Sequence, residues 1–337
     1  MATVIVVLHP SDELYGADRV MLAVIADLTA RDAVEVWLPT DLEYRRKGFS
    51  RILAERGVPV RRVGLPVLRR AYANPRDLVR VSRRGLGLAR LLRRARPDSL
   101  YVNTSALAPS IPIASALGVP STLHIHETWG AFERRALTHL CTPADTVVTV
   151  GAATRDALPE VLRRRAVIRR HTVQAQPEGP GAARIRAALD IGDAPVILYA
   201  GRWTPGKGIA ELLTALRDSD AHLLLLGGPP PSGRTVDVLS VIASCGVAHR
   251  VHVVGEVDDV WPYIYACDAV AVPSVHPESF PTIALEALAA GRPVLASDIG
   301  GLPEIVVPGS GWLLPPGDIQ AWSQRLSAIE PRHDLQQ

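Results

Sequence analysis

Short apolar runs alternate with segments of helical periodicity along nearly the whole chain. Runs such as residues 4–8 and 196–199 are four or five residues long and rich in valine, leucine and isoleucine. Runs of this length are typical of strands buried on both faces of a parallel sheet. In the intervening segments, apolar positions recur with the spacing of one helix face. The alternation therefore predicts layered, doubly wound α/β structure.

The pattern predicts individual elements in both halves of the chain. In the first half, strands are expected at 3–8, 34–38, 99–102, 121–126, 146–150 and 167–171, and helices at 20–28, at 109–117 and from about 152 onward. In the second half, strands are expected at 196–199, 222–226, 252–254, 269–272 and 293–296, and helices at 209–216, 236–245, 261–266, 282–290 and 319–329.

The chain is long enough for two domains. Its 337 residues exceed the usual size of one hydrophobic core. Residues 172–182 are polar and rich in proline and glycine, and the strand–helix rhythm restarts after them. We therefore expect a first domain at residues 1–175, a linker at 176–194 and a second domain at 195–337. Ligands of such sheets bind beyond the carboxyl ends of the strands, so functional residues should follow strands.

Composition narrows the class of protein further. Apolar residues make up 47% of the chain, which is ordinary for a globular protein. The three cysteines are far apart and lack metal-ligand spacing, which favours buried, reduced thiols. No signal peptide is recognisable, and prolines interrupt the uncharged stretch 99–123, so no transmembrane segment is expected. A cytoplasmic protein is the interpretation that these features favour.

Positive charge is concentrated in one segment. Residues 61–96 contain twelve arginines and one acid, Asp77, whereas the net charge of the whole chain is only +3. Leucines and valines are interleaved with these arginines. One interpretation is peripheral association with an anionic membrane, at its inner face, or with an acidic acceptor. The other is a set of solvated helices. Nucleic acid fits less well, because the arginines after residue 75 have no aromatic residues among them for base stacking.

A glycine-rich loop with two cations follows the first strand expected in the second domain. Residues 201–208 read GRWTPGKG and precede a helix, so backbone N–H groups and the cations Arg202 and Lys207 can bind phosphate. The loop resembles the phosphate loop of NTPases, which has serine or threonine as its last residue to bind magnesium. Gly208 stands there instead. We therefore expect a loop that binds a diphosphate without a metal.

Two carboxylates surround the start of a later helix. Glu278 and Glu286 are separated by seven residues, and Pro281 suits the first turn of the helix between them. The free backbone N–H groups of Thr282 and Ile283 should point toward an anion. One interpretation of Glu286 is an exposed residue on a helix face. The other is that both carboxylates accept hydrogen bonds from sugar hydroxyls.

Histidines occur near the end of one strand in the first domain. His124 and His126 both lie on the strand expected at 121–126, and their rings are expected on opposite faces of the sheet. His126 lies nearer the carboxyl end, where a functional role is more common than at the middle of a strand.

Other motifs carry little weight. Asp218 and Asp220 form a D-x-D sequence, a metal motif of other transferases, but they lie between a helix end and a strand start. Gly85 and Gly87 lack the third glycine and the preceding strand of a dinucleotide fingerprint. No bound metal and no cofactor are expected.

Together these motifs resemble the retaining GT-B glycosyltransferases, specifically glycosyltransferase family 4, also described as glycosyl transferases group 1. The resembling segments are YAGRWTPGKGIAELLTAL, VPSVHPESFPTIALEALAAGRPVLASDIGGLPEIV and GWLLPPGD in the second half, and SDELYGADRVMLAVIADL in the first. The resemblance implies two Rossmann-like domains that face each other across a cleft. The first would bind the acceptor and the second the nucleotide-sugar donor.

The resemblance also implies roles for individual residues. Arg202 and Lys207 would bind the donor diphosphate and stabilise the departing nucleotide. Glu278 would contact hydroxyls of the transferred sugar, and Glu286 would bind the ribose. His126 would touch the donor sugar near the reacting carbon. The other implied donor-site residues are Gly16, Gly201, Glu256, Val257, Ser279, Phe280, Thr282 and Ile283.

Three features depart from the family pattern. The first loop has one glycine, Gly16, where many members have two, and Pro281 replaces a common glycine. Members usually carry further helices after the one expected at 319–329, the last of which crosses back to the first domain. This chain is expected to lack that helix.

The resulting expectation is a metal-independent, retaining transferase. It would move a hexose-like sugar from a UDP or GDP donor to a glycan or lipid-linked acceptor, in polysaccharide or glycoconjugate biosynthesis. Two alternatives stay open: a nucleotide-sugar 2-epimerase of the same fold, and a non-catalytic partner that binds nucleotide sugars.

Overall fold

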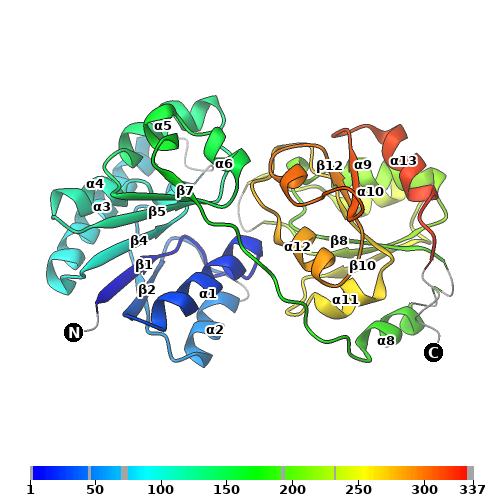
Figure 1. Ribbon diagram of the computed structural model, residues 1–337, viewed down its shortest axis with the longest axis horizontal. Coiled ribbons are helices and arrows are strands. Elements are labelled where there is room, and N and C mark those ends of the chain that lie inside the picture. Colours follow the sequence, from blue (N-terminus) through cyan, green and yellow to red (C-terminus); the bar gives the residue numbers. More distant parts are fainter. Residues whose placement is uncertain are drawn as a thin grey trace. The chain divides into compact units, whose positions relative to one another are not determined.

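The chain forms two compact units, each built on one parallel sheet. The computed structural model describes residues 3–44, 47–69, 75–189, 191, 194–230 and 233–331. The two units are Met1–His171 and Thr172–Gln337. Helices cover both faces of each sheet (Figure 1). The doubly wound α/β class predicted from the alternation of apolar and helical segments is confirmed in both halves.

Seven strands of the described residues make up the first sheet, in the order β3-β2-β1-β4-β5-β6-β7. Strands β1 to β3 are added in one direction and β4 to β7 in the other, so the order reverses between β1 and β4. Such a reversal is where ligands of doubly wound sheets bind. The strands are β1 (Val4–Leu8), β2 (Ala33–Pro39), β3 (Val60–Val63), β4 (Ser99–Asn103), β5 (Ser121–Ile125), β6 (Thr146–Thr149) and β7 (Ala166–Ile168).

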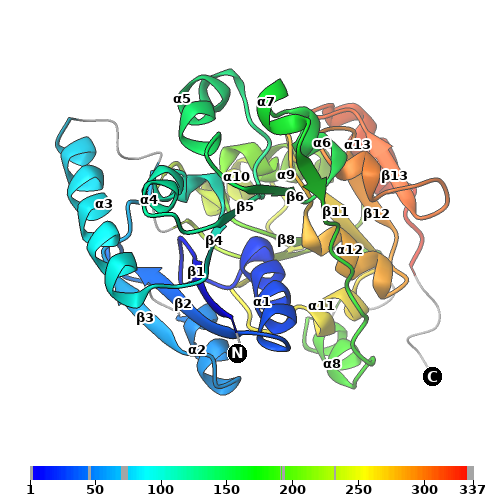
Figure 2. The ribbon, with the colours of Figure 1, turned by 60° about the vertical axis from the view of Figure 1, so that its left-hand side comes forward.

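The helices of the first unit lie on opposite faces of this sheet. Figures 1 and 2 show α1 and α2 on one face and α3, α4 and α5 on the other. Met21 and Phe49 are fully buried under the first pair, and Leu88 and Ile111 under the second group. The helices are α1 (Gly16–Thr29), α2 (Gly48–Glu55), α3 (Pro75–Ala95), η1 (Ser105–Leu107), α4 (Ser110–Ala116), α5 (Ala131–Cys141), α6 (Ala152–Asp156) and α7 (Glu160–Arg163).

The second sheet has six strands within the described residues, in the order β10-β9-β8-β11-β12-β13. Its order reverses between β8 and β11. The loops after these two strands therefore diverge at the carboxyl edge. The strands are β8 (Val196–Ala200), β9 (His222–Leu226), β10 (Val251–Gly255), β11 (Ala269–Val272), β12 (Val294–Ser297) and β13 (Gly311–Leu314).

The helices of the second unit also form two layers. The cores on the two faces are separate, one around Leu212 and Trp322 and the other around Ile264 and Ala284. Burial of such side chains stabilises the fold by about 1.5–3 kcal/mol for each large one. The helices are α8 (Gly181–Ala188), η2 (Pro205–Lys207), α9 (Ile209–Ala215), η3 (Leu216–Asp218), α10 (Val238–Cys245), α11 (Trp261–Ala266), α12 (Thr282–Ala289), η4 (Leu302–Glu304) and α13 (Ile319–Ser327).

Helix α8 lies inside the segment expected as a linker, residues 176–194. It packs against α11, and a Cβ atom at Gly181 would lie 3.0 Å from the ring of Pro262. The Arg186 guanidinium donates to the carbonyl oxygen of Ala266 at 2.9 Å and pairs with Asp268 at 3.3 Å. This segment is therefore part of the second unit. Its helix was not predicted because it is only two turns long and its apolar face is mostly alanine.

No helix within the described residues combines the length and apolar character needed to cross a bilayer. The longest helix, α3, is strongly basic.

Glycines let the loops at the carboxyl edge of the second sheet approach closely. A Cβ atom at Gly208, whose φ is +69°, would lie 1.7 Å from the carbonyl oxygen of Pro273. The same atom at Gly301 would lie 1.8 Å from the carbonyl oxygen of Ser279. The loops after β8, β11 and β12 therefore stack backbone against backbone, and only glycine is compatible with this contact.

A pair of alanine substitutions tests this close approach. Gly208 and Gly246 have nearly equal φ values, +69° and +70°, but Gly246 has nothing within 4 Å of an added Cβ. Gly246→Ala should lower the free energy of unfolding by about 1–2 kcal/mol, the cost of placing alanine in a left-handed conformation. Gly208→Ala should cost clearly more, roughly 3 kcal/mol or above, because the loop after β11 must also move. Urea unfolding of both variants measures the difference, and equal losses would contradict the close approach.

Candidate functional site

The carboxylate of Glu278 is fixed at the carboxyl edge of the second sheet by residues from several loops. Its Oε2 accepts a hydrogen bond from Lys207 Nζ at 2.6 Å, and its Oε1 accepts one from the Ser274 hydroxyl. Its backbone carbonyl accepts from the N–H of Gly301 at 2.7 Å. The Glu278 side chain is 12% exposed and that of Lys207 37% exposed. A cation and a carboxylate thus lie together where the strand order reverses, between β8 and β11.

The glycine-rich loop after β8 is held in place through its backbone. The N–H of Trp203 donates to the carbonyl oxygen of Gly228 at 2.9 Å, after β9. The carbonyl oxygen of Gly206 accepts from Val275 at 3.1 Å and from His276 at 3.2 Å, after β11. Arg202 and Gly201 lie on this loop, and the Tyr199 hydroxyl donates to the carbonyl oxygen of Arg202 at 3.0 Å. The geometry of the loop is therefore set by both neighbouring strands.

This geometry explains why the loop is not an NTPase phosphate loop. Gly208 is left-handed and its backbone contacts Pro273, so no serine or threonine side chain fits at that position. Helix α9 begins only after it, at Ile209. The hydroxyl that would bind magnesium in an NTPase is excluded by space as well as by sequence.

Helix α12 carries the second predicted carboxylate, Glu286. It begins at Thr282, and Glu286 lies one turn further on with only 7% of its surface exposed. The interpretation of Glu286 as an exposed helix-face residue is therefore wrong. The backbone N–H groups of Thr282 and Ile283 belong to the first turn, where a helix offers no internal acceptor.

The remaining predicted donor-site residues lie along the same edge of the sheet. Ser279 and Phe280 follow Glu278 directly, and Phe280 is partly buried against the core. Glu256 and Val257 follow β10. The Glu256 side chain lies beside Gly228, and its Cγ atom would be 3.2 Å from a Cβ atom added to Gly228. The structure thus gathers the second-unit residues at strand ends. Gly16 and His126 lie in the first unit.

In the first unit, a chain of buried polar residues spans the reversal between β1 and β4. His9 Nε2 contacts Asp18 Oδ1 at 2.8 Å, and Asn103 Nδ2 contacts His9 Nδ1 at 2.7 Å. Asn103 Oδ1 in turn lies 2.7 Å from His126 Nε2. With Asp18 ionised, the donors run in one direction, and His126 carries its proton on Nε2. His126 is therefore held in one ring orientation by Asn103 at the end of β4, which in turn is held by His9 after β1 and Asp18 in α1.

Burial sets the protonation of this region. Burial lowers the pKa of His126 to about 3, helped by the nearby His171, and lowers the pKa of His171 to about 4. Burial also holds the pKa of His124 well below its usual value. Burial alone would raise the pKa of Asp18, but hydrogen bonds from His9, Tyr15 and Ser11 reverse this and lower it. His124, His126 and His171 are thus neutral and Asp18 is charged at neutral pH.

The backbone is strained beside this chain. Thr104 has φ +77° and ψ 152°, a region that glycine normally occupies, at a cost of about 1–3 kcal/mol. The turn brings the Ser105 hydroxyl to 3.0 Å from the carboxylate of Glu127. Burial raises the pKa of Glu127, although hydrogen bonds from Ser105 oppose the shift. Strain of this kind at a strand end is typical of a functional site.

The second unit matches a known family. Residues 182–336 match the family described as Glycosyl transferases group 1. The chain is 35% identical over 145 residues to the D-inositol 3-phosphate glycosyltransferase of Corynebacterium diphtheriae, covering 40% of this chain and 34% of that protein. It is 41% identical over 170 residues to the same enzyme of Actinosynnema mirum, covering 45% of this chain and 40% of that protein. The match spans well under half the length of these curated relatives.

The fold of the whole chain matches solved structures. Anabaena Alr3699/HepE in complex with UDP-glucose superposes with a TM-score of 0.81 at 21% identity, covering 96% of this chain and 88% of that one. Sucrose-phosphate synthase from Thermosynechococcus elongatus gives a TM-score of 0.72 at 20% identity, covering 96% and 89%. Residues 182–336 thus match the group 1 glycosyltransferases, and the fold of the whole chain is the GT-B fold. The fold class predicted from the sequence is confirmed, and the predicted family is confirmed for residues 182–336.

One prediction about the first unit is wrong. The rings of His124 and His126 were expected on opposite faces of a strand that included both. The two rings lie 4.0 Å apart, on the same side. Side chains two residues apart on an extended backbone point to the same face, so opposite faces should not have been expected.

Residues that sequence reasoning missed fix the orientation of the predicted ones. Ser274 contacts Glu278, and His9, Asp18 and Asn103 lead to His126. A signal was present, because His9 and Asn103 are polar residues at the carboxyl ends of apolar strands. Their pairing was not visible, since 94 residues separate them along the chain.

Neutral buried histidines make stability depend on pH. In the unfolded chain these histidines take up protons near pH 6.5, whereas in the folded chain His126 does so only near pH 3 and His171 near pH 4. The free energy of unfolding should therefore fall as the pH drops from 6.5 to 4, by about 1.4 kcal/mol per pH unit for each such histidine. Chemical unfolding at several pH values measures the slope. His126→Gln should make the free energy of unfolding depend less steeply on pH, by the contribution of one histidine. An unchanged slope would contradict a neutral His126 ring.

Proposed function

We propose that the protein is a retaining, metal-independent glycosyltransferase. It transfers a hexose-like sugar from a UDP- or GDP-linked donor to a glycan or lipid-linked acceptor. The observation that carries the proposal is the pairing of Lys207 with Glu278 at 2.6 Å, at the β8–β11 reversal. A nucleotide sugar needs both groups there: positive charge for the diphosphate and a carboxylate for sugar hydroxyls.

The charges suit the chemistry of sugar transfer. When the bond between the sugar and the diphosphate breaks, negative charge accumulates on the leaving diphosphate. Lys207 and Arg202 stabilise this charge from the loop after β8, in place of a metal ion. Glu278 accepts hydrogen bonds from the sugar, and Ser274 prevents its carboxylate from rotating away. Fixed charges need no reorganisation during the reaction, which is why preorganised sites accelerate it.

His126 is the first-unit residue that we assign to the donor sugar. Its ring is neutral, and Asn103 fixes its orientation at 2.7 Å. A neutral ring adds no charge that would repel an electron-poor sugar carbon, and it can hydrogen-bond to a hydroxyl. Asp18 and His9 act on it only through Asn103, as positioning residues.

The relatives support a nucleotide-sugar donor. One similar structure is a complex with UDP-glucose, and the similar curated proteins are named for transfer to D-inositol 3-phosphate. A phosphorylated cyclitol is therefore an acceptor to include beside glycans and lipid-linked sugars.

A donor and acceptor panel tests the function. The purified chain is incubated with UDP- and GDP-sugars, with and without each acceptor and with EDTA, and nucleotide release and products are measured. Acceptor-dependent release that persists in EDTA, with retained anomeric configuration in the product, is the expected result. An acceptor-independent change of the donor sugar would favour the 2-epimerase. Donor binding without turnover on any acceptor would favour a non-catalytic partner.

Substitutions at the ion pair test the site itself. Lys207→Ala and Glu278→Ala should each lower kcat/KM by about 10²–10³, the usual effect of removing one preorganised charge. Arg217→Gln and Glu330→Gln, at exposed positions of the same unit, are the matched controls and should leave kcat/KM unchanged. Full activity in both alanine variants would overturn the assignment.

A further inference from the structure

Helix α3 carries an arginine-lined hollow outside the site described above. The hollow has a volume of about 640 Å³ and is lined by Gly64, Arg76, Val79, Arg80, Arg83, Arg84, Gly87 and Leu91. On α3 these positions recur every three or four residues, so they form one stripe along the helix. In most helices such a stripe facing a neighbouring segment is apolar. Here four of its side chains are arginines.

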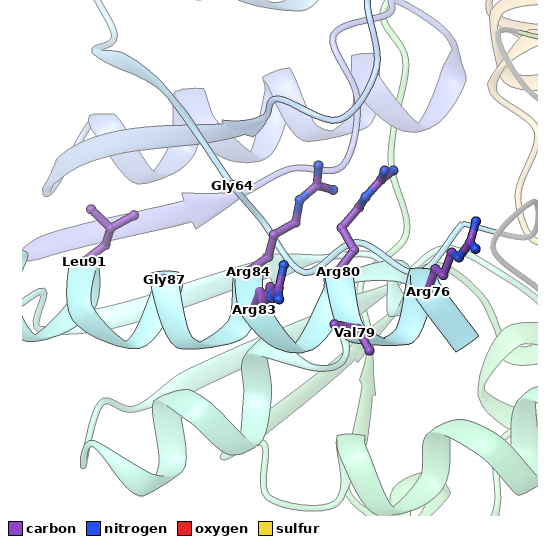
Figure 3. Close-up of a pocket in the computed structure, with 8 residues that line it drawn as sticks. All are labelled: Gly64, Arg76, Val79, Arg80, Arg83, Arg84, Gly87 and Leu91. Carbon is purple, nitrogen blue, oxygen red and sulfur yellow. The ribbon is translucent and has the colours of Figure 1, made fainter. Parts of the chain in front are cut away.

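Two glycines keep the hollow open. Gly87 has nothing within 4 Å of an added Cβ, and Gly64 would meet only the Arg84 side chain, at 3.6 Å. Figure 3 shows Arg76, Arg80 and Arg84 extending from the same side of α3, toward the segment that carries Gly64. The core-facing side of α3 is separate, since Leu88 and Leu92 are buried there.

The positive charge in the hollow is only partly neutralised. Arg84 lies 3.7 Å from Asp41, but Arg69 already forms a two-pronged ion pair with that carboxylate, at 2.9 Å from each oxygen. Arg76, Arg80 and Arg83 form no ion pair with a carboxylate of any described residue. Residues 70–74 of this basic stretch lie outside the described residues. Guanidinium groups gathered in this way suit a phosphate group.

Apolar side chains beside the arginines indicate the source of the phosphate. Val79 is 52% exposed and Leu86 62%, and both lie within about one helical turn of Arg83 on α3. A free phosphate ion would make no use of these side chains, whereas a lipid bilayer offers phosphates next to acyl chains. Nucleic acid is disfavoured because α3 contains no phenylalanine, tyrosine or tryptophan for stacking.

We infer that α3 docks on an anionic lipid bilayer, with a headgroup phosphate in the hollow between Arg76, Arg80 and Arg83 and with Val79 and Leu86 at the acyl boundary. Each arginine adds to the attraction, and salt weakens it. This inference does not depend on the transferase activity.

Vesicle sedimentation with the full chain tests the inference. Vesicles of phosphatidylcholine alone are compared with vesicles that contain phosphatidylglycerol, at low and high salt. Salt-sensitive binding to the anionic vesicles alone is expected. The triple variant Arg76→Gln, Arg80→Gln, Arg83→Gln should bind about 100-fold more weakly, from about 1 kcal/mol per arginine at an anionic surface.

The matched control removes the same charge from the same helix. Arg90, Arg93 and Arg94 are exposed and do not line the hollow. Their triple glutamine variant removes the same charge but leaves the hollow intact, so it should lose clearly less binding than the hollow variant. Circular dichroism verifies that both variants are folded.

Three outcomes would overturn the inference. Equal losses of vesicle binding in the two triple variants would mean that the hollow contributes only general surface charge. Undiminished binding by the double variant Val79→Ser, Leu86→Ser would show that no apolar contact with the acyl chains is made. Calorimetric binding of inorganic phosphate to the hollow, without any binding to anionic vesicles, would assign the site to a free anion. The vesicle readout is separate from nucleotide release, so failure here leaves the proposed function untouched.

Discussion

The carboxylate of Glu278 is the fixed point on which the second unit's site depends. Lys207 and Ser274 hold its two oxygens, and Gly301 holds its backbone. These contacts require the loops after β8, β11 and β12 to lie backbone against backbone, which only glycine permits at Gly208 and Gly301. These glycines are therefore needed to bring Lys207 and Glu278 together, and not only to let a phosphate approach the backbone.

In the first unit, the candidate site residue His126 is fixed in place by side chains. Where its strand order reverses, Asp18, His9 and Asn103 form a buried hydrogen-bonded chain that ends at His126. Burial keeps the ring neutral, and the charge of Asp18 orders the donors along the chain. In both units, residues that do not themselves reach a ligand fix the ones assigned to it. Chain topology places both sets at the same kind of position, a reversal of strand order.

Much of this architecture could be predicted from the sequence, and the reasons for the exceptions are physical. Strands β9 and β11 were predicted with the observed bounds, because β11 is entirely apolar and β9 is apolar after His222. Strand β3 was missed because two arginines occupy its four positions, and α8 because it is short. The residues around Glu278 and Lys207 were found because each follows a strand. The contacts that fix them join loops distant along the chain, and no local pattern records such a contact.

The most direct measurement of the central claim is a crystal structure of the chain with a bound nucleotide-sugar donor. The account predicts that the diphosphate lies at Lys207, on the loop after β8, and that a hydroxyl of the sugar lies within hydrogen-bonding distance of Glu278. A donor bound away from these two residues, or a diphosphate held through a metal ion rather than through Lys207, would contradict it.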